Sequence, residues 1–129
     1  MLTQCPEQLL YTKSHEWLEL NGDIATIGIT PHAQEQLGDV VFVELPEVGS
    51  SCTAGAAIGV IESVKTASDF YSPVTGEIVD SNAQLESVPE LINQDPCQQG
   101  WICKIRIKDH KELEQLISAE QYAEQIDEG

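Results

Sequence analysis

The fold of this chain is decided by one stretch, residues 58–70, which runs Ile58-Gly59-Val60-Ile61-Glu62-Ser63-Val64-Lys65-Thr66-Ala67-Ser68-Asp69-Phe70. Its first part alternates with a period of two residues, which is typical of a β-strand with one buried face. A turn-like break around Lys65 separates this strand, ending near Val64, from a second one that starts near Phe70. The stretch therefore predicts a hairpin that displays Lys65 at its tip.

Short alternating runs broken by Gly and Pro continue on both sides of this hairpin. They are Ile27 and Ile29; Val41, Val43 and Leu45; Ile58, Val60, Glu62 and Val64; Val74, Gly76 and Ile78; and Trp101, Cys103, Ile105 and Ile107. Such runs are typical of a sandwich or barrel. Asn21-Gly22 predicts a second hairpin, which joins a strand around Trp17 to one around Ala25. We predict a mainly β fold.

Capping signals predict helices in two places. Thr30 and Pro31 followed by Gly38 indicate a short helix over residues 32–37, because they supply an N-cap, a first-turn Pro and an exit Gly. Asp109 with Glu112 resembles a capping box. Ser118 with Gln121 repeats this pattern, so we expect the chain to end in two short helices or one kinked helix.

The composition limits the possible partners. The 129 residues suit one domain, and the formal net charge of −16 repels phosphate backbones and anionic lipids. We therefore expect protein partners with basic surfaces, and neither nucleic acid nor membrane. No apolar run approaches the roughly 20 residues of a spanning helix, and residues 1–11 lack a signal-peptide pattern. A cytoplasmic monomer is expected, with a processed organelle form as the alternative.

Lys65 is isolated, since residues 14–103 hold 14 Asp and Glu but no other Lys or Arg. A Schiff-base lysine must be neutral, whereas the nearby carboxylates of Glu62 and Asp69 favour the protonated amine. A modification site needs only an exposed amine, and acylation leaves a long neutral arm. The pattern favours a modified carrier over both an enzyme and an ordinary surface lysine, so no catalytic residue is assigned.

The residues around Lys65 resemble the H protein family of the glycine cleavage system, in the lipoyl and biotinyl domain superfamily. Glu62-Ser63-Val64-Lys65 is similar to the lipoylation motif of that family. Other motifs follow in family order along nearly the whole chain: Ser14-His15-Glu16-Trp17, Gly28-Ile29-Thr30, Leu37-Gly38-Asp39, Val43-Glu44-Leu45-Pro46, Ser72-Pro73-Val74-Thr75-Gly76-Glu77, Leu91-Ile92-Asn93, Asp95-Pro96 and Gly100-Trp101.

This resemblance implies a barrel-sandwich hybrid of two antiparallel sheets with short helices, including a C-terminal one. Residues 1–129 would form one lipoyl-carrier domain, with a β core over about 23–108 and a C-terminal helical segment over about 109–126. It implies lipoate bound covalently to Lys65, attached by a lipoate ligase or lipoyl transferase.

In the family, the lipoyl arm takes the methylamine group of glycine from the P protein, a glycine decarboxylase. It carries the group to the T protein, an aminomethyltransferase, and is reoxidised by the L protein, a dihydrolipoyl dehydrogenase. The carrier catalyses none of these steps. The same resemblance therefore implies that this chain is not an enzyme.

The loaded arm of the family folds into a cleft on the carrier. The resemblance assigns Ser14, Glu16 and Asp69 to this cleft, and Glu62, Ser63 and Val64 to the lipoylation context. Carboxylates suit the cleft because they can pair with a protonated amine. Glu16 as a solvated strand residue and Asp69 as a turn residue are equally good interpretations. For the neighbouring His15 and Trp17 we expect structural packing.

Several alternatives share features of the chain. Biotin carriers typically flank their lysine with Met, whereas Val64 and Thr66 stand here, and lipoyl domains of 2-oxoacid dehydrogenases usually place Asp before it. H-protein-like carriers also act in lipoyl relay and sulfur metabolism. An acidic interaction module with unmodified Lys65 is the last alternative.

The Cys and His residues give no metal-ligand spacing. Cys5, Cys52, Cys97 and Cys103 form no Cys-x-x-Cys pair, and the three His residues are far apart in sequence. We expect reduced thiols, as in other cytoplasmic proteins, with Cys103 packed in the core.

Overall fold

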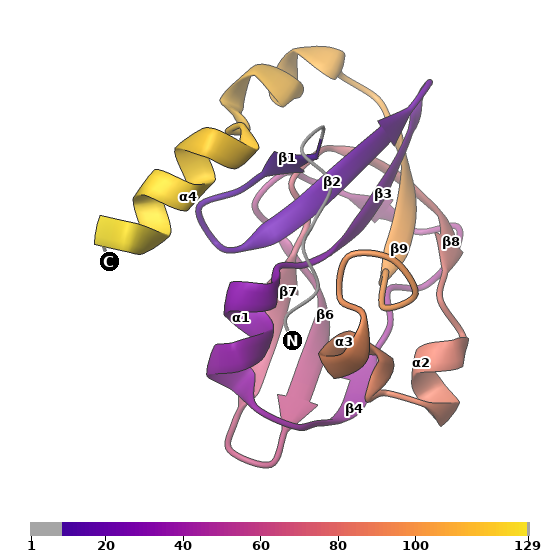
Figure 1. Ribbon diagram of the computed structural model, residues 1–129. Coiled ribbons are helices and arrows are strands. Elements are labelled where there is room, and N and C mark those ends of the chain that lie inside the picture. Colours follow the sequence, from indigo (N-terminus) through magenta and orange to yellow (C-terminus); the bar gives the residue numbers. More distant parts are fainter. Residues whose placement is uncertain (1–8, 129) are drawn as a thin grey trace.

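Two antiparallel sheets enclose the core of the computed structural model, which describes residues 9–128 (Figure 1). Within this part of the chain, six strands form the larger sheet, in the order β1 (Leu10–Tyr11), β2 (Glu16–Asn21), β3 (Ile24–Ile29), β9 (Cys103–Ile107), β8 (Gly76–Ser81) and β5 (Ser51–Cys52). The smaller sheet has the order β4 (Val40–Glu44), β6 (Ala57–Ser63) and β7 (Ala67–Tyr71). The predicted mainly β sandwich is confirmed.

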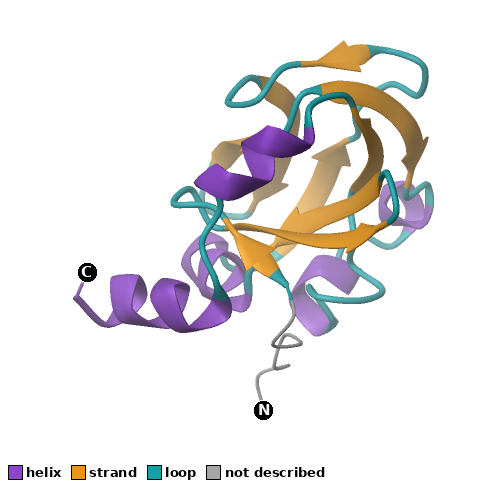
Figure 2. Ribbon diagram, turned by 90° about the horizontal axis from the view of Figure 1, so that it is seen from above, coloured by secondary structure: helices purple, strands orange, loops and turns teal. Residues whose placement is uncertain are grey.

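Short helices lie outside the strands, as Figure 2 shows. They are α1 (Pro31–Leu37), α2 (Gln84–Ser87), α3 (Leu91–Gln94), the 3₁₀ helix η1 (His110–Gln115) and α4 (Ala119–Glu128). Helix α4 lies beside β1 and β2 (Figure 1). No helix in residues 9–128 is long and apolar enough to cross a membrane.

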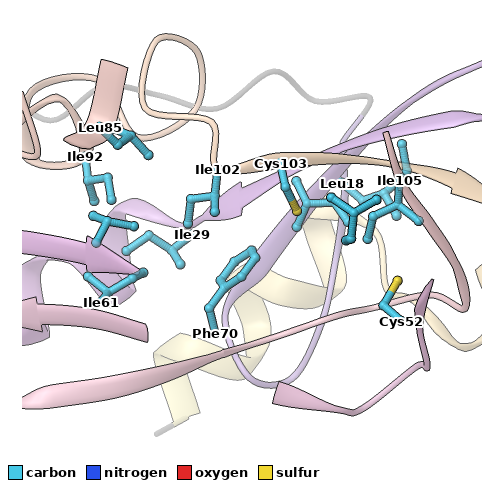
Figure 3. Close-up of a cluster of buried hydrophobic side chains, with 14 of the residues drawn as sticks. Leu18, Ile29, Cys52, Ile61, Phe70, Leu85, Ile92, Ile102, Cys103 and Ile105 are labelled. Atoms are coloured by element: carbon cyan, nitrogen blue, oxygen red, sulfur yellow. The ribbon is translucent and has the colours of Figure 1, made fainter. Parts of the chain in front are cut away.

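The core lies between the two sheets and joins residues that are distant in sequence. Phe70 of the small sheet points toward Ile102, which precedes β9 (Figure 3). Ile61 also packs in this core, with Ile78 and Ile105 from the larger sheet. Burial of such side chains contributes about 2 kcal/mol each, which is the main stabilisation of a domain of this size. Cys103 is fully buried here, as predicted.

Both predicted hairpins are present. Strands β2 and β3 pair from Glu16 with Ile29 to Asn21 with Ile24, so the loop is Gly22-Asp23. The turn is therefore one residue later than the predicted Asn21-Gly22. Strands β6 and β7 pair up to Glu62 with Ala67, which leaves Lys65 in the loop.

The predicted strand faces are right in β8 and β9 and wrong in the small sheet. In β4 the register shifts between Val40 and Phe42. This bulge leaves Val41 exposed while Val40 and Val43 are buried, because the extra residue reverses the alternation. In β6 the register also shifts, between Ala57 and Gly59, so Ile58 and Ile61 both pack against the core while Val60 and Glu62 lie on the other face.

The predicted cap of α1 is confirmed, since Thr30 Oγ1 accepts a hydrogen bond from Ala33 N at 3.2 Å. The Ser118 box is also confirmed: Ser118 N donates to Gln121 Oε1, and Gln121 N donates to Ser118 Oγ. The chain ends in two helices, η1 and α4.

The other predicted capping box, Asp109 with Glu112, is right for Asp109 and wrong for Glu112. Asp109 caps η1 by accepting from Lys111 N. The Glu112 carboxylate instead accepts from Thr75 N at 2.6 Å and from Thr75 Oγ1 at 2.7 Å. These two hydrogen bonds attach η1 to the turn before β8, and this tertiary contact replaces the local one.

The cysteines are not all reduced. Cys52 and Cys103 are free and buried, whereas Cys97 is disulfide-bonded. The expectation of reduced thiols is therefore wrong for Cys97. Disulfide formation depends on the distance between two Cα atoms, which spacing in the sequence does not give.

Candidate functional site

Lys65 is exposed on the three-residue turn between β6 and β7. The turn is closed by a hydrogen bond from Ser63 N to Thr66 O at 2.8 Å. Ser63 Oγ also accepts from Lys65 N and from Thr66 N, each at 3.2 Å. These short-range hydrogen bonds fix the backbone under Lys65, whose side chain is exposed.

The loop after α1 supports this turn from one side. Val64 N donates to Asp39 O at 3.0 Å, although the Val64 side chain is 68% exposed. Gly38 has a φ of 81°, and a Cβ added there would lie 3.2 Å from Lys65 Cε. The Lys65 side chain therefore passes directly over a position where only glycine fits well.

The carboxylates near Lys65 in sequence do not pair with its amine. Among the described residues, the ion pairs within 4 Å are Arg106 with Glu77 and His110 with Asp23. Glu62 is half-buried in β6, opposite Phe42 of β4. The Lys65 amine is thus available for modification without breaking an ion pair in this part of the chain.

A cleft of about 310 Å³ lies beside the turn. It is lined by Ser14, His15, Glu16 and Ile29 of the β2–β3 region, by Ala33, Gln36 and Leu37 of α1, and by Ile61 and residues 66–69 of the β6–β7 hairpin. It brings together Ser14, Glu16 and Asp69, which sequence analysis placed in one cleft, and it reaches Thr66 next to Lys65. Its wall combines apolar side chains, such as Ile29, Leu37 and Ile61, with polar and charged ones.

Glu16 lies in the wall of this cleft and is 3% exposed. Its Oε1 accepts hydrogen bonds from Thr12 Oγ1 and Ser14 Oγ, each at 2.6 Å. Burial raises the pKa of Glu16, and the bonds from Ser14, Thr12 and the Tyr71 backbone oppose part of this rise. The interpretation of Glu16 as a solvated strand residue is therefore wrong.

Asp69 differs from Glu16 in its exposure. It is exposed within β7, opposite Val60 of β6, and so it is not a turn residue. Glu16 is thus a buried acceptor already held by protein donors, while Asp69 is an exposed carboxylate at the cleft. Both carboxylates line the same cleft, which suits a cationic group.

His15 and Trp17, the two neighbours of Glu16 in sequence, have different surroundings. Trp17 packs in the interior as predicted, and its Nε1 donates to Pro96 O at 2.9 Å. His15 packs against His32 and Tyr122, as expected, but it also lines the cleft. This second position was not predicted, because no local pattern in the sequence marks His15 as a cleft residue.

The site suits a long acyl arm better than a metal ion. Within residues 9–128 no group of three or more His, Cys, Asp or Glu side chains could hold a metal. The residues present instead provide an exposed amine on a fixed turn, a partly apolar cleft beside it and carboxylates in that cleft. These features fit lipoate on Lys65.

Comparison with known proteins gives a consistent family. The family model "Glycine cleavage H-protein" matches residues 9–129. A glycine cleavage system H protein of Rubrobacter xylanophilus is 52% identical over 127 residues, which cover 98% of each chain. One from Vibrio campbellii is 54% identical over 121 residues and covers 93% of this chain and 96% of that relative.

A solved structure agrees with these sequences. The crystal structure of a glycine cleavage system H protein from Mycobacterium marinum superposes with a TM-score of 0.86 at 38% identity, covering 95% of this chain and 98% of that one. The resemblance noted in the sequence is thereby confirmed. The chain belongs to the glycine cleavage H-protein family.

Proposed function

We propose that this chain is the lipoyl carrier of a glycine cleavage system and that lipoate is joined to Lys65 Nζ by an amide bond. Family membership supports the carrier role, in which the chain is not itself an enzyme. The single observation that supports Lys65 is its exposure on a fixed turn, beside a cleft with buried and exposed carboxylates. An amine with no catalytic partner is suited to modification by another enzyme.

When bound, lipoate supplies a disulfide that can accept the methylamine group of glycine. The chain's own residues would receive and shield the cargo. Glu16 and Asp69 would pair with its ammonium group, since charge-assisted hydrogen bonds are the stronger ones. Ser14 holds the Glu16 carboxylate in place through its 2.6 Å hydrogen bond. The apolar wall, including Ile29 and Leu37, would exclude water.

The three residues before Lys65 would have a separate role, in lipoylation. Glu62, Ser63 and Val64 present the lysine to the attaching enzyme, a lipoate ligase or lipoyl transferase. Ser63 fixes the turn through its hydroxyl, and the exposed Val64 side chain offers an apolar contact beside the amine. Lys65 is the attachment point in this assignment.

The partners follow from the system to which the family belongs. We assign the P protein, the T protein and the L protein as the enzymes that meet the arm in turn. The net charge of −16 suits partners with basic surfaces. We further propose that the chain forms one domain, with a β core over about 23–108, and acts as a cytoplasmic monomer; a processed organelle form is the alternative.

Intact-mass spectrometry with peptide mapping of the native protein tests this proposal. The expected result is the mass of one lipoyl group on the peptide that contains Lys65. Biotin on that peptide, or an unmodified lysine in cells supplied with lipoate, would contradict it. Lipoate could be found on Lys65 while the cells need the protein for lipoyl relay or sulfur metabolism and not for glycine cleavage. That result would support the carrier role and contradict the proposed pathway.

A further inference from the structure

Three consecutive residues, Ser14, His15 and Glu16, line the same cleft. Ser14 and His15 belong to the turn between β1 and β2, which is closed by hydrogen bonds from His15 N to Thr12 O at 3.2 Å and from Thr12 N to Glu16 O at 3.0 Å. His15 has a φ of 70° in this turn, and it is the only residue other than glycine with a positive φ in residues 9–128. A left-handed residue is common at the end of such a short hairpin turn, and here it directs the His15 ring toward the cleft.

Contacts with two helices fix the position of the His15 ring. Its Nδ1 lies 2.6 Å from the hydroxyl oxygen of Tyr122, which belongs to α4. Its ring packs 4.8 Å from the ring of His32, which belongs to α1. Its carbonyl oxygen accepts from Thr30 N at 3.1 Å. The His15 ring at the cleft is thus positioned by parts of the chain up to 107 residues away.

Counting hydrogen bonds assigns the proton on the His15 ring. Thr30 is fully buried, and its Oγ1 accepts from Ala33 N and lies 2.7 Å from the Tyr122 hydroxyl. The Thr30 hydroxyl proton has only the Tyr122 oxygen as a partner in the described part of the chain. Thr30 therefore donates to Tyr122, and Tyr122 donates to His15 Nδ1. A neutral ring that accepts at Nδ1 carries its proton on Nε2.

We propose that Tyr122 of α4 is a positioning residue that holds His15 as a neutral ring, protonated on Nε2, so that the cleft beside Glu16 accepts an ammonium group. This rests on the proposed function, because the ammonium group is that of the cargo on the arm. The C-terminal helix then belongs to the carrier site although it contributes no lining residue. It acts through one hydrogen bond.

Because His15 can gain a proton, binding of the ammonium group in the cleft should depend on pH. The titratable groups that face it are Glu16, His32, Asp69 and Tyr122. Burial lowers the pKa of His15, and repulsion from His32 lowers it further. A proton on Nδ1 would also make Tyr122 the acceptor from His15 and leave the hydroxyl proton of either Tyr122 or Thr30 without an acceptor among the described residues. The ring is therefore neutral at pH 7, and acidification would add a positive charge that repels the cargo.

Long-range ¹H–¹⁵N NMR of histidine-labelled protein tests the ring assignment without lipoate. We expect the His15 signals of the Nε2–H form in the wild type, and a mixture of both neutral forms in Tyr122→Phe. Tyr11→Phe is the matched control, because Tyr11 stacks on Tyr122 at 4.7 Å yet its hydroxyl has no described hydrogen bond to His15. That variant should keep the wild-type signals. An Nδ1–H ring in the wild type, or unchanged signals in Tyr122→Phe, would overturn the proposal.

The second measurement is the lifetime of the methylamine-loaded carrier as a function of pH. Tyr122→Phe should shorten it roughly fivefold at pH 7.5, the factor of one neutral hydrogen bond. His15→Asn tolerates the positive φ and cannot gain a charge, so its lifetime should fall less than that of the wild type between pH 7.5 and 6. Equal pH profiles would refute a role for the ring. Absence of lipoate on Lys65 by mass would instead refute the proposed function and leave the NMR result standing.

Discussion

The tip of the β6–β7 hairpin and the segment Ser14–Glu16 belong to one site but differ in exposure and in how much they depend on distant parts of the chain. At the tip, Lys65 is exposed, and most of the hydrogen bonds that shape its turn come from Ser63, two residues away. In the segment, Glu16 is buried and its neighbour His15 is held by α1 and α4. Attachment therefore depends mainly on the local structure of the turn, whereas the cleft depends also on contacts of His15 with α1 and α4. Substitutions should separate the two properties.

The largest effect is expected at the tip. Lys65→Arg should abolish lipoylation and glycine-dependent methylamine transfer completely, because a guanidinium keeps the charge but is not a substrate for the attaching enzyme. The fold should be unchanged, since Lys65 is exposed and makes no ion pair within the described residues. Intact mass, thermal unfolding and a glycine cleavage assay measure these outcomes. Residual glycine cleavage by this variant would show that attachment occurs elsewhere.

Moving the amine by one residue tests whether the turn specifies its position. In the double variant Lys65→Thr with Thr66→Lys, both backbone N–H groups can still donate to Ser63 Oγ. Lipoylation should nevertheless be lost, because the new amine would stand where Thr66 lines the cleft and not over Gly38. Thr66→Ala, which keeps Lys65, should be lipoylated like the wild type. Efficient lipoylation of the lysine at position 66 would show that the turn does not specify the position of the amine.

The cleft should give a smaller and different effect. Glu16→Ala is expected to shorten the lifetime of the methylamine-loaded form roughly tenfold or more, as for loss of a charge-assisted hydrogen bond. Lipoylation of Lys65 should be unaffected. Glu19→Ala is the matched control, because Glu19 is an exposed carboxylate on the same strand. An unchanged lifetime in Glu16→Ala would contradict the proposal that Glu16 pairs with the cargo.

The same carboxylate should make stability depend on pH. The folded-state pKa of Glu16 is raised above its unfolded value, chiefly by burial. The folded protein therefore binds the proton more tightly, and the stabilisation present below the unfolded pKa is lost as pH rises through the folded pKa. Relative to Glu16→Gln, the free energy of unfolding of the wild type should be greater near pH 4 than at pH 7. Urea titrations at several pH values measure the difference, and a flat profile would contradict the buried position.

The contrast between tip and cleft also explains what the sequence could predict. The Lys65 hairpin and the caps at Thr30 and Ser118 depend on neighbours within a few residues, so periodicity and capping signals found them. The bulge that turns Val41 outward arises from pairing between β4 and β6. Helices α2 and α3 have four residues each, which is too short for a periodic pattern, and they were not predicted.

For the site, residue chemistry alone gave Lys65, and the family resemblance gave Ser14, Glu16 and Asp69. The structure brings the last three into one cleft. The burial of Glu16 could not be predicted, because its partners Thr12 and Ser14 look like ordinary loop residues. His15 was assigned to packing alone, since its position at the cleft depends on contacts with Tyr122 and His32, which are distant in the sequence.

The smallest effect is expected from the cap of α4, and it tests the same contrast from a distance. Ser118→Ala removes the acceptor of Gln121 N and should lower the free energy of unfolding by about 1 kcal/mol. Because α4 carries Tyr122, fraying of its first turn should also shorten the lifetime of the loaded form slightly, while Lys65 is lipoylated as before. Ser87→Ala is a control in α2, whose serine makes no described side-chain hydrogen bond. If Ser118→Ala changed lipoylation as much as the lifetime, the tip and the cleft would not be independent.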